Sequence, residues 1–270
     1  MNCIAIIQAR MSSTRLPGKV LEDINGISLL NHIYLRLSNC LNIDKIVVAT
    51  SIEKSDDILV EYCLRHNIEV FRGSLNNVLS RFISIIEMFQ PKLIARITGD
   101  CPLIYPDFID FQIDCLNKSN SDAIYIEREP EIFCGQGVFS SKALKIIFNE
   151  SINPGDLEHV GSYFFTENPN RFEWIKLIIP EEYRNFKYRL TVDELDDLLF
   201  IRNIYDNLWD GSPIPFRKVL NYLKDNRHKL EINNNVVDSS INKEIKDKKE
   251  IFKPIFKETF HWDDLNLKSK

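Results

Sequence analysis

The fold is decided by the stretch Cys3-Ile4-Ala5-Ile6-Ile7 and by the loop that follows it, Gln8-Ala9-Arg10-Met11-Ser12-Ser13-Thr14-Arg15-Leu16-Pro17-Gly18-Lys19. An apolar run this short and rich in isoleucine predicts a fully buried strand. In an open α/β sheet, ligands bind where loops leave the carboxyl ends of the strands. This loop carries three cations and three hydroxyl groups, which suit a polyphosphate. The alternative is that Arg10, Arg15 and Lys19 are solvated charges beside an ordinary Pro-Gly turn.

Strand and helix patterns alternate along the first half of the chain. Strands are predicted at residues 2–8, 45–50, 69–71, 93–97 and 123–126, with helices at 28–40, 55–65 (capped by Ser55), 78–89 and 106–116. This alternation predicts an α/β fold with a mostly parallel sheet and helices on both faces. The second half is less regular, with helices expected at 140–148, 157–166, 194–208 and 215–223, and strands at 172–179 and 188–191.

The composition excludes several classes of protein. The net charge of −5 argues against a general nucleic-acid or anionic-membrane binder, and no apolar run approaches the length of a membrane span. Arg10 interrupts the first apolar segment too early for a signal peptide. Six scattered cysteines form no CxxC pair and no zinc-binding spacing. We therefore expect a cytoplasmic protein with reduced thiols.

The chain is expected to form one domain over residues 1–226, followed by a Lys/Asn-rich C-terminal tail over 227–270. The tail contains three consecutive asparagines at 233–235 and a lysine-rich run at 243–249, which predict partial disorder. Its last part, from Ile251 to Trp262, is apolar enough to dock. A packed appendage and an oligomer contact are both open.

Two aspartates follow predicted strands. Asp100 ends the segment Arg96-Ile97-Thr98-Gly99-Asp100, and Asp193 lies between the predicted strand at 188–191 and a helix. Mg²⁺ is usually held by one or two carboxylates together with phosphate oxygens, so both are candidate metal ligands. The alternatives are a turn aspartate bonded to its own backbone and a helix N-cap.

These motifs resemble those of the cytidylyltransferases that activate sugars. The N-terminal loop fits the pattern A-R-x-x-S-x-R-L-P-G-K of a family that includes the acylneuraminate and KDO cytidylyltransferases, and the nearest branch is the one named after SpsF. The resemblance covers about residues 1–210 and implies a three-layer, Rossmann-like nucleotide-diphospho-sugar transferase (GT-A-like) fold and a homodimer. It assigns catalytic roles to Arg10, Lys19, Asp100 and Asp193, with Asp100 and Asp193 holding Mg²⁺.

The same resemblance implies a nucleotide site and an acceptor site. The segment Arg72 to Arg81 is similar to the family's R-G-S-x-x-D-V-L-x-R, with Asn77 where Asp is usual; alternatively it is a helix start with an ion-paired Arg81. The nucleotide-binding residues implied are Ala9, Arg10, Met11, Ser12, Arg15, Lys19, Arg72, Ser74, Asn77, Arg81, Thr98 and Gly99. The acceptor-binding residues implied are Gly135, Gln136, Glu158 and His159.

The acceptor region departs from the family pattern. Residues 133–140 keep Gly135 and the pair Val138-Phe139 but lack the acidic residues usual in the SpsF branch. Around His159 the chain keeps Glu158, His159, Val160 and Tyr163 of the R-E-H-V-T-P-Y motif that is common in the SpsF branch. The alternative is that this segment is only the capped start of a helix. The identity of the acceptor therefore stays open.

The resemblance predicts transfer of CMP from CTP to a sugar-acid or phosphorylated acceptor with release of pyrophosphate, for surface polysaccharide biosynthesis. CTP and a small-molecule acceptor are the expected partners. One alternative is a GT-A-type glycosyltransferase that uses a nucleotide sugar, although such enzymes typically hold their metal through D-x-D and the chain contains none. Another is a non-catalytic nucleotide-binding paralogue, which the altered acceptor region motivates.

Overall fold

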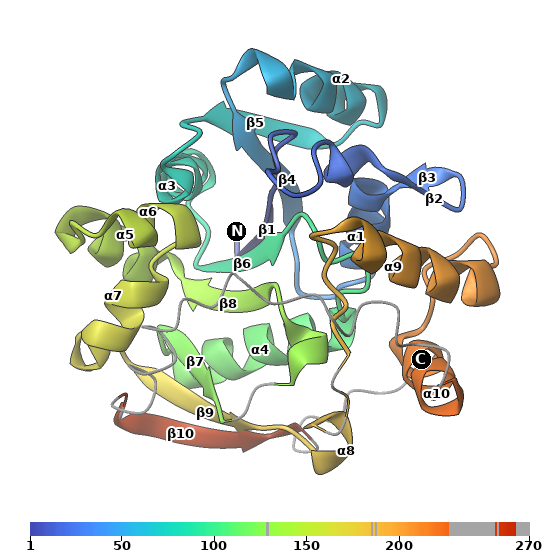
Figure 1. Ribbon diagram of the computed structural model, residues 1–270. Coiled ribbons are helices and arrows are strands. Elements are labelled where there is room, and N and C mark those ends of the chain that lie inside the picture. Colours follow the sequence, from blue (N-terminus) through green and yellow to red (C-terminus); the bar gives the residue numbers. More distant parts are fainter. Residues whose placement is uncertain (128–129, 185, 187, 227–251, 253, 263–270) are drawn as a thin grey trace.

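The computed structural model describes residues 1–127, 130–184, 186, 188–226, 252 and 254–262. Its main sheet has five strands in the order β5 (Glu69–Gly73), β4 (Lys45–Ser51), β1 (Cys3–Gln8), β6 (Leu93–Thr98) and β8 (Gln136–Ser140) (Figure 1). The first four are parallel and β8 is antiparallel to β6. The predicted α/β class and mostly parallel sheet are confirmed.

The central strand β1 is buried on both faces, as predicted. Cys3, Ala5 and Ile7 belong to one apolar cluster, and Ile4 and Ile6 to the other. Alternate side chains of a strand point to opposite faces, so both clusters share this strand. Its carboxyl end therefore delivers the N-terminal loop (residues 9–19) to the edge of the sheet.

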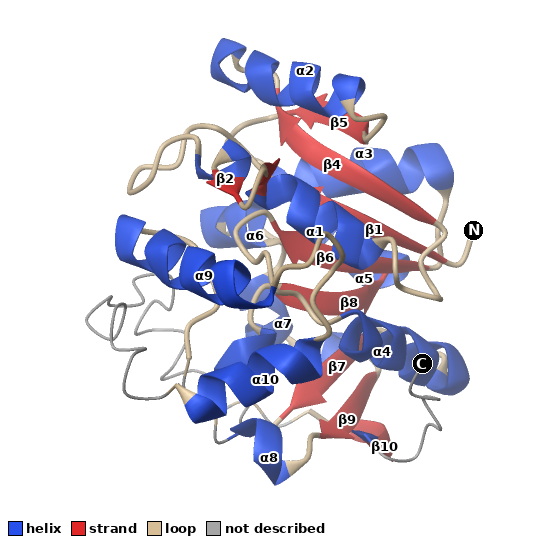
Figure 2. Cartoon of the chain, turned by 90° about the vertical axis from the view of Figure 1, so that its right-hand side faces the viewer, coloured by secondary structure: helices blue, strands red, loops and turns tan. Residues whose placement is uncertain are grey.

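Helices cover both faces of the sheet and complete three layers (Figure 2). The helices are α1 (Leu29–Leu37), α2 (Asp57–Arg65), α3 (Val78–Phe89), α4 (Pro106–Ser119), α5 (Ser141–Glu150), α6 (Pro154–His159), α7 (Ser162–Glu167), α8 (Glu181–Arg184), α9 (Leu195–Leu208) and α10 (Phe216–Asp225). Helices α1, α4, α9 and α10 contribute to one cluster, and α3, α5 and α7 to the other. No helix among these is both long and apolar enough to cross a bilayer.

Side-chain oxygens start three of the helices. Ser28 accepts a hydrogen bond from the amide of Asn31, Ser140 from that of Ala143, and Asn77 from that of Ser80. Such caps satisfy amide groups that have no partner within the helix. They fix the starts of α1, α5 and α3 close to the predicted positions.

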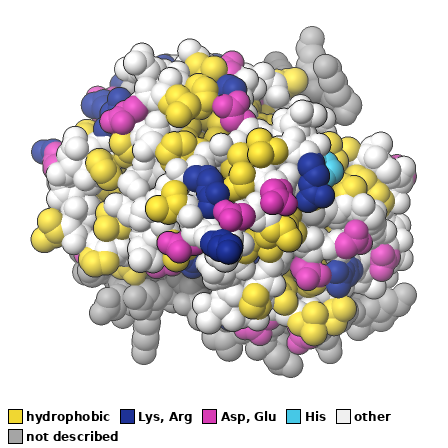
Figure 3. Space-filling model, turned by 90° about the horizontal axis from the view of Figure 1, so that it is seen from above, with side chains coloured by type: hydrophobic (Ala, Val, Ile, Leu, Met, Phe, Trp, Pro, Cys, Tyr) yellow, Lys and Arg dark blue, Asp and Glu magenta, His cyan; other side chains and the backbone are white. Residues whose placement is uncertain are grey.

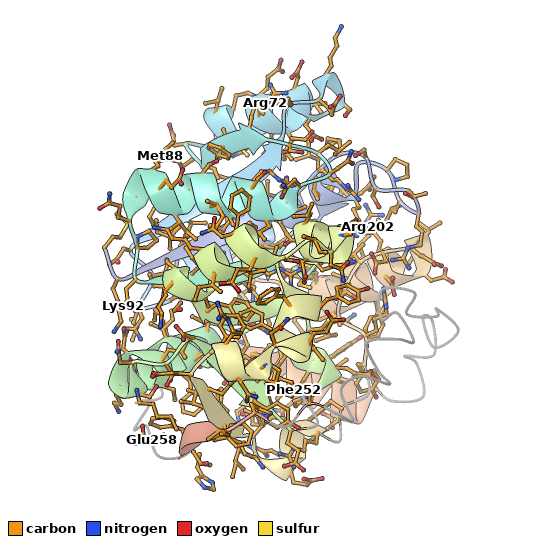
Figure 4. All side chains as sticks on the ribbon, turned by 90° about the vertical axis from the view of Figure 1, so that its left-hand side faces the viewer. Arg72, Met88, Lys92, Arg202, Phe252 and Glu258 are labelled. Carbon is orange, nitrogen blue, oxygen red and sulfur yellow. The ribbon has the colours of Figure 1, made fainter. Side chains whose placement is uncertain are left out.

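A second sheet lies beside β8 and includes a strand from the tail. Its order is β10 (Phe256–His261), β9 (Trp174–Ile178) and β7 (Ala123–Ile126), all parallel. The predicted strand at 123–126 therefore exists but belongs to this second sheet. Figure 1 shows β10 along the outer edge, and Figure 4 places Glu258 there. The segment around β10 is packed on its own chain, whereas residues 227–251 and 263–270 lie outside the described residues.

Three local predictions are wrong. No strand forms over the described residues 188–191. Instead, the amide of Val192 donates to the carbonyl of Asp100, in the turn that follows β6. The helix expected at 157–166 breaks at Val160 and Gly161, whose φ angles are 54° and 85°. Ser55 caps nothing, because it lies inside a 3₁₀ turn, Lys54–Asp56, that precedes α2.

The break between α6 and α7 has a buried cause. The carboxylate of Asp156 accepts the amides of Tyr163 and Phe164, and Gly161 donates to the carbonyl of Asp156. A buried carboxylate bound to the first amides of α7 begins a new helix there. The break therefore divides the expected helix into α6 and α7, which pack against each other.

Candidate active site

A cavity of about 460 Å³ opens at the carboxyl ends of β1 and β6. It is lined by the N-terminal loop, the turn after β6, the residues before α9, and the junction of α6 and α7. Its basic character is local: the face seen in Figure 3 shows acidic and basic side chains interspersed, without a broad patch of either sign. Cavities at such strand ends are the usual ligand sites of α/β sheets.

The N-terminal loop is anchored by Asp56, a residue that sequence reasoning missed. The carboxylate of Asp56 accepts from the amide of Met11 at 2.7 Å, from the hydroxyl of Thr50 at 3.0 Å, and from the amide and hydroxyl of Ser51. Asp56 is fully buried. A carboxylate surrounded by donors is satisfied without a cation, so it ties the loop to the end of β4.

Lys19 joins two candidate metal ligands. Its Nζ lies 3.2 Å from Asp100 Oδ2, 2.9 Å from Asp193 Oδ1 and 2.7 Å from the carbonyl oxygen of Val192. Asp193 also contacts Arg15, at 3.0 Å, and Arg189. Four of the predicted residues, far apart in the sequence, thus form one charged cluster.

The cluster holds its groups ionised. Burial lowers the pKa of Lys19, but Asp100 and Asp193 outweigh this effect and raise the pKa above its ordinary value. Burial raises the pKa of Asp193, yet Lys19, Arg15 and Arg189 together bring it below its ordinary value. At neutral pH an ammonium group therefore faces an ionised carboxylate at the floor of the cavity.

On the opposite wall, α6 supplies Glu158 and His159. Glu158 lies 3.7 Å from Arg10. Burial lowers the pKa of His159 in spite of the neighbouring Glu158. The imidazole is therefore neutral at pH 7 and can accept a proton or a hydrogen bond.

Residues 4–225 match the model of the cytidylyltransferase family. The spore coat polysaccharide biosynthesis protein SpsF of Bacillus subtilis is 34% identical over 225 residues, which cover 82% of this chain and 93% of that protein. Protein MJ1063 of Methanocaldococcus jannaschii is 34% identical over 241 residues, covering 89% and 98%. A solved cytidylyltransferase structure from Leptospira borgpetersenii superposes with a TM-score of 0.77 at 26% identity, covering 85% of this chain and 97% of that chain.

The chain belongs to the cytidylyltransferase family. It is thus a nucleotidyltransferase enzyme, and the charged cluster lies within the matched residues.

The cluster suits the divalent cation that this family implies. Three oxygens, from Asp100, Asp193 and the carbonyl of Val192, surround the single nitrogen of Lys19. Mg²⁺ prefers oxygen ligands and usually takes only one or two carboxylates, completing its shell with water and phosphate. In the described part of the chain no group of three or more His, Cys, Asp or Glu side chains could hold a metal ion.

Several residues implied for nucleotide binding line the cavity, and others lie outside it. Ala9, Arg10, Arg15, Lys19, Arg81, Thr98 and Gly99 line it, whereas Met11 and Ser12 do not and their neighbours Ser13 and Thr14 do. Only glycine fits at position 99 without a steric clash, because a Cβ there would lie 2.8 Å from the carbonyl oxygen of Gln8.

In the segment that starts α3, Arg72, Ser74 and Asn77 do not line the cavity, whereas Arg81 does. The Ser74 hydroxyl accepts from the amide of Asn77, and Asn77 in turn caps the helix. Arg72 binds the carbonyls of Ser51 and Glu53, and Figure 4 places it near α2. The ion pair expected as the alternative for Arg81 is wrong within the described structure: its Nη1 donates to the carbonyl of Ala49.

The acceptor residues are divided by the register of β8. Gln136 pairs with Ile97, so its side chain points to the α4 face and accepts the amide of Tyr105, away from the cavity. Gly135 lines the cavity with a φ of 78°. The side chain of Gln136 is therefore not placed to contact an acceptor. Sequence reasoning also missed Arg96 and Arg189, although Arg96 begins the segment that ends at Asp100 and Arg189 lies in the strand predicted at 188–191.

Proposed function

We propose that the enzyme transfers CMP from CTP to a sugar-acid or phosphorylated acceptor and releases pyrophosphate. The observation that carries this proposal is the convergence of Arg15, Lys19, Asp100 and Asp193 at the strand ends, in a chain of the cytidylyltransferase family. A cationic loop facing two carboxylates provides for both a triphosphate and a cation.

The reaction needs positioning and charge stabilisation. An acceptor oxygen attacks the α-phosphorus of CTP, and the bond from that phosphorus to the oxygen of the departing pyrophosphate breaks. Negative charge develops on the phosphate oxygens, so fixed cations lower the barrier. Arg10, Arg15 and Lys19 are the side chains proposed to bind the phosphates. Arg81, which lines the cavity and forms no ion pair with a described residue, adds a further cation.

Asp100 and Asp193 are the residues that would hold Mg²⁺. When bound, the ion supplies positive charge that polarises the α-phosphate. Arg189 contacts both Asp193 and Asp197 and thereby fixes the direction of the Asp193 carboxylate. Lys19 contacts both proposed ligands, so its charge stays beside the reacting phosphate.

The wider role is proposed from the relatives. SpsF is named as a spore coat polysaccharide biosynthesis protein, which supports a product destined for surface polysaccharide. A homodimer is also proposed, on the resemblance to the family, and sedimentation of the purified chain tests it.

The experiment is a measurement of pyrophosphate release. The protein is incubated with each of the four nucleoside triphosphates, Mg²⁺ and a panel of acidic and phosphorylated sugars. We expect release with CTP and at least one acceptor, and its loss when EDTA removes the cation. In a parallel incubation, nucleotide sugars replace the triphosphates. Consumption of a nucleotide sugar there, with no pyrophosphate release from any triphosphate, would indicate a glycosyltransferase, and nucleotide binding without turnover a non-catalytic protein.

A further inference from the structure

Two arginines that line the cavity form no ion pair with any described residue. Arg10, Arg15, Lys19 and Arg189 each lie within 4.0 Å of an acidic oxygen. Arg81 and Arg96 also line the cavity, and over the described residues neither forms an ion pair. Leaving a guanidinium without a counter-charge in a half-buried place is unfavourable, so such groups commonly serve a ligand.

The two cations serve different parts of the cavity. For Arg81, burial and the charge of Arg10 lower the pKa, and Asp56 raises it; Arg10 and Asp56 both lie on the side of the N-terminal loop. For Arg96, burial lowers the pKa, and Asp100 and Cys134 raise it. The charge of Arg96 in turn lowers the pKa of His159. Arg96 therefore lies close to Cys134 and His159, which line the cavity in the two segments that the resemblance implies for the acceptor.

The strands next to Arg96 offer it no counter-charge. On β8 the residue paired with Arg96 is Gly137, which lies against the ring of Phe139, and on β1 it is the buried, apolar Ile6. Arg96 and Thr98 share one face of β6, because side chains two residues apart in a strand point the same way. Arg96 and Thr98 both line the cavity, so this face of β6 borders it.

The guanidinium of Arg96 is also oriented in advance. Its Nε donates to Oε1 of Gln8 at 3.0 Å. This bond leaves the edge formed by Nη1 and Nη2 for a ligand, since no other hydrogen bond of Arg96 is found in the described structure. Two parallel N–H groups match the two oxygens of a carboxylate or a phosphate.

We infer that Arg96 binds the negatively charged group of the acceptor, with the imidazole of His159 facing the acceptor's hydroxyl groups. This inference rests on the proposed function, since it assumes that an acceptor enters the cavity. Under this inference, Arg96 makes the enzyme specific for anionic rather than neutral acceptors. A carboxylate and a phosphate offer the same oxygen pair, so the experiment must distinguish them.

The test compares Arg96→Gln and Arg96→Lys with wild type, using CTP, Mg²⁺ and three matched acceptors: a sugar acid, a sugar phosphate and the corresponding neutral sugar. Loss of a charge-assisted hydrogen-bond pair corresponds to a rise of about tenfold to a hundredfold in KM for the anionic acceptor. We expect this rise for Arg96→Gln, a smaller one for Arg96→Lys, and unchanged KM values for CTP and for the neutral sugar. The anion with the larger rise identifies the natural group.

Arg65→Gln is the matched control, because Arg65 is exposed on α2 and binds only the carbonyl of Glu61 among the described residues. Its kinetics should equal those of wild type, and thermal melting checks that all variants fold. If Arg96→Gln leaves the acceptor KM unchanged, or raises the KM of CTP equally, the inference is overturned while the proposed function stands. If wild type releases no pyrophosphate with any acceptor, the proposed function fails, and the inference with it.

Discussion

At the scale of single residues, the site depends on one ammonium group shared by two carboxylates. Asp100→Asn keeps the size of the side chain and removes its charge, while Lys19 retains Asp193 and the carbonyl of Val192. We expect kcat/KM to fall by at least about a hundredfold, because charge stabilisation at the α-phosphate is lost. Pyrophosphate release measures the change.

The control for this prediction is Asp196→Asn, an exposed aspartate in the first turn of α9. The substitution removes the same charge as Asp100→Asn, three residues from Asp193 in the sequence. Asp196 itself does not line the cavity. Its turnover should equal that of wild type. Full activity in Asp100→Asn, with an unchanged melting temperature, would contradict the role given to Asp100.

Gly135 is a second residue whose identity matters. Its φ is 78°, and a Cβ there would lie 2.3 Å from the sulfur of Cys101 and 2.4 Å from Oγ1 of Thr98. Gly135→Ala should therefore displace the wall of the cavity and reduce turnover. Gly26→Ala provides a control for backbone strain alone, because its φ is 89° and no atom lies within 4 Å of the added Cβ.

For Gly26→Ala the expected cost is about 1–2 kcal/mol of folding free energy without loss of turnover, which is the usual penalty of a left-handed residue. Gly135→Ala should cost more, since crowding adds to strain. Urea unfolding and pyrophosphate release measure both effects. Equal stability and equal activity of the two variants would mean that the loop around Gly135 adapts freely.

At the scale of elements, the predictions that succeeded depend on local sequence. The apolar run of β1 and the cap at Asn77 each indicate their structure within a few residues. The split of α6 from α7 depends on the buried carboxylate of Asp156, and the direction of Gln136 on the register between β6 and β8. Contacts of that kind are formed between distant segments, so no local pattern could indicate them.

The tail supplies an element that supports the acceptor side of the site. Trp262, just after β10, packs against the rings of Tyr105, Phe108, Phe111, Phe133 and Tyr183. Phe133 immediately precedes the cavity-lining residues Cys134 and Gly135. The tail thus stabilises the segment from which this wall of the cavity is built.

Trp262→Ala should consequently lower the free energy of unfolding by about 3 kcal/mol, as is usual when a packed aromatic ring is removed. The midpoint of urea unfolding measures it. Ile255→Ala, in the same segment but 83% exposed, should change stability by about 0.5 kcal/mol or less. Equal midpoints for the two variants would show that the ring of Trp262 contributes nothing.

At the scale of the whole molecule, the site is assembled from segments separated by most of the chain. The motifs around Lys19, Asp100 and Asp193 could be recognised singly. The meeting of Lys19 with Asp100 followed from the expected parallel sheet, whereas that with Asp193 was implied only by the resemblance to the family. Asp56, Arg96 and Arg189 were not singled out, because an aspartate among hydroxyls and an arginine within a strand acquire their roles only from neighbours in space. Sequence reasoning therefore found the charged centre and missed the residues that orient it.

Stability of the whole molecule should depend on pH through His32. This residue of α1 is 1% exposed, bonds the carbonyl of Ile24 at 2.8 Å, and packs against the rings of Tyr205 and Trp209. Burial lowers its pKa to about 4, with Arg36 adding to the effect and Asp23 opposing it. The folded protein therefore keeps His32 neutral at pH values where the unfolded chain, with an ordinary value near 6.5, takes up a proton.

Because the folded pKa is the lower one, stability is fully present above about pH 6.5 and is lost progressively as the pH falls to about 4. The loss reaches about 3 kcal/mol, from about 1.4 kcal/mol for each unit of pKa difference. Urea unfolding at several pH values, on wild type and His32→Gln, measures it. Subtracting the two curves removes the other groups that titrate nearby, and the wild type's advantage over the variant should shrink by that amount as the pH falls. A constant difference between the curves would mean that His32 becomes protonated equally in the folded and unfolded chains.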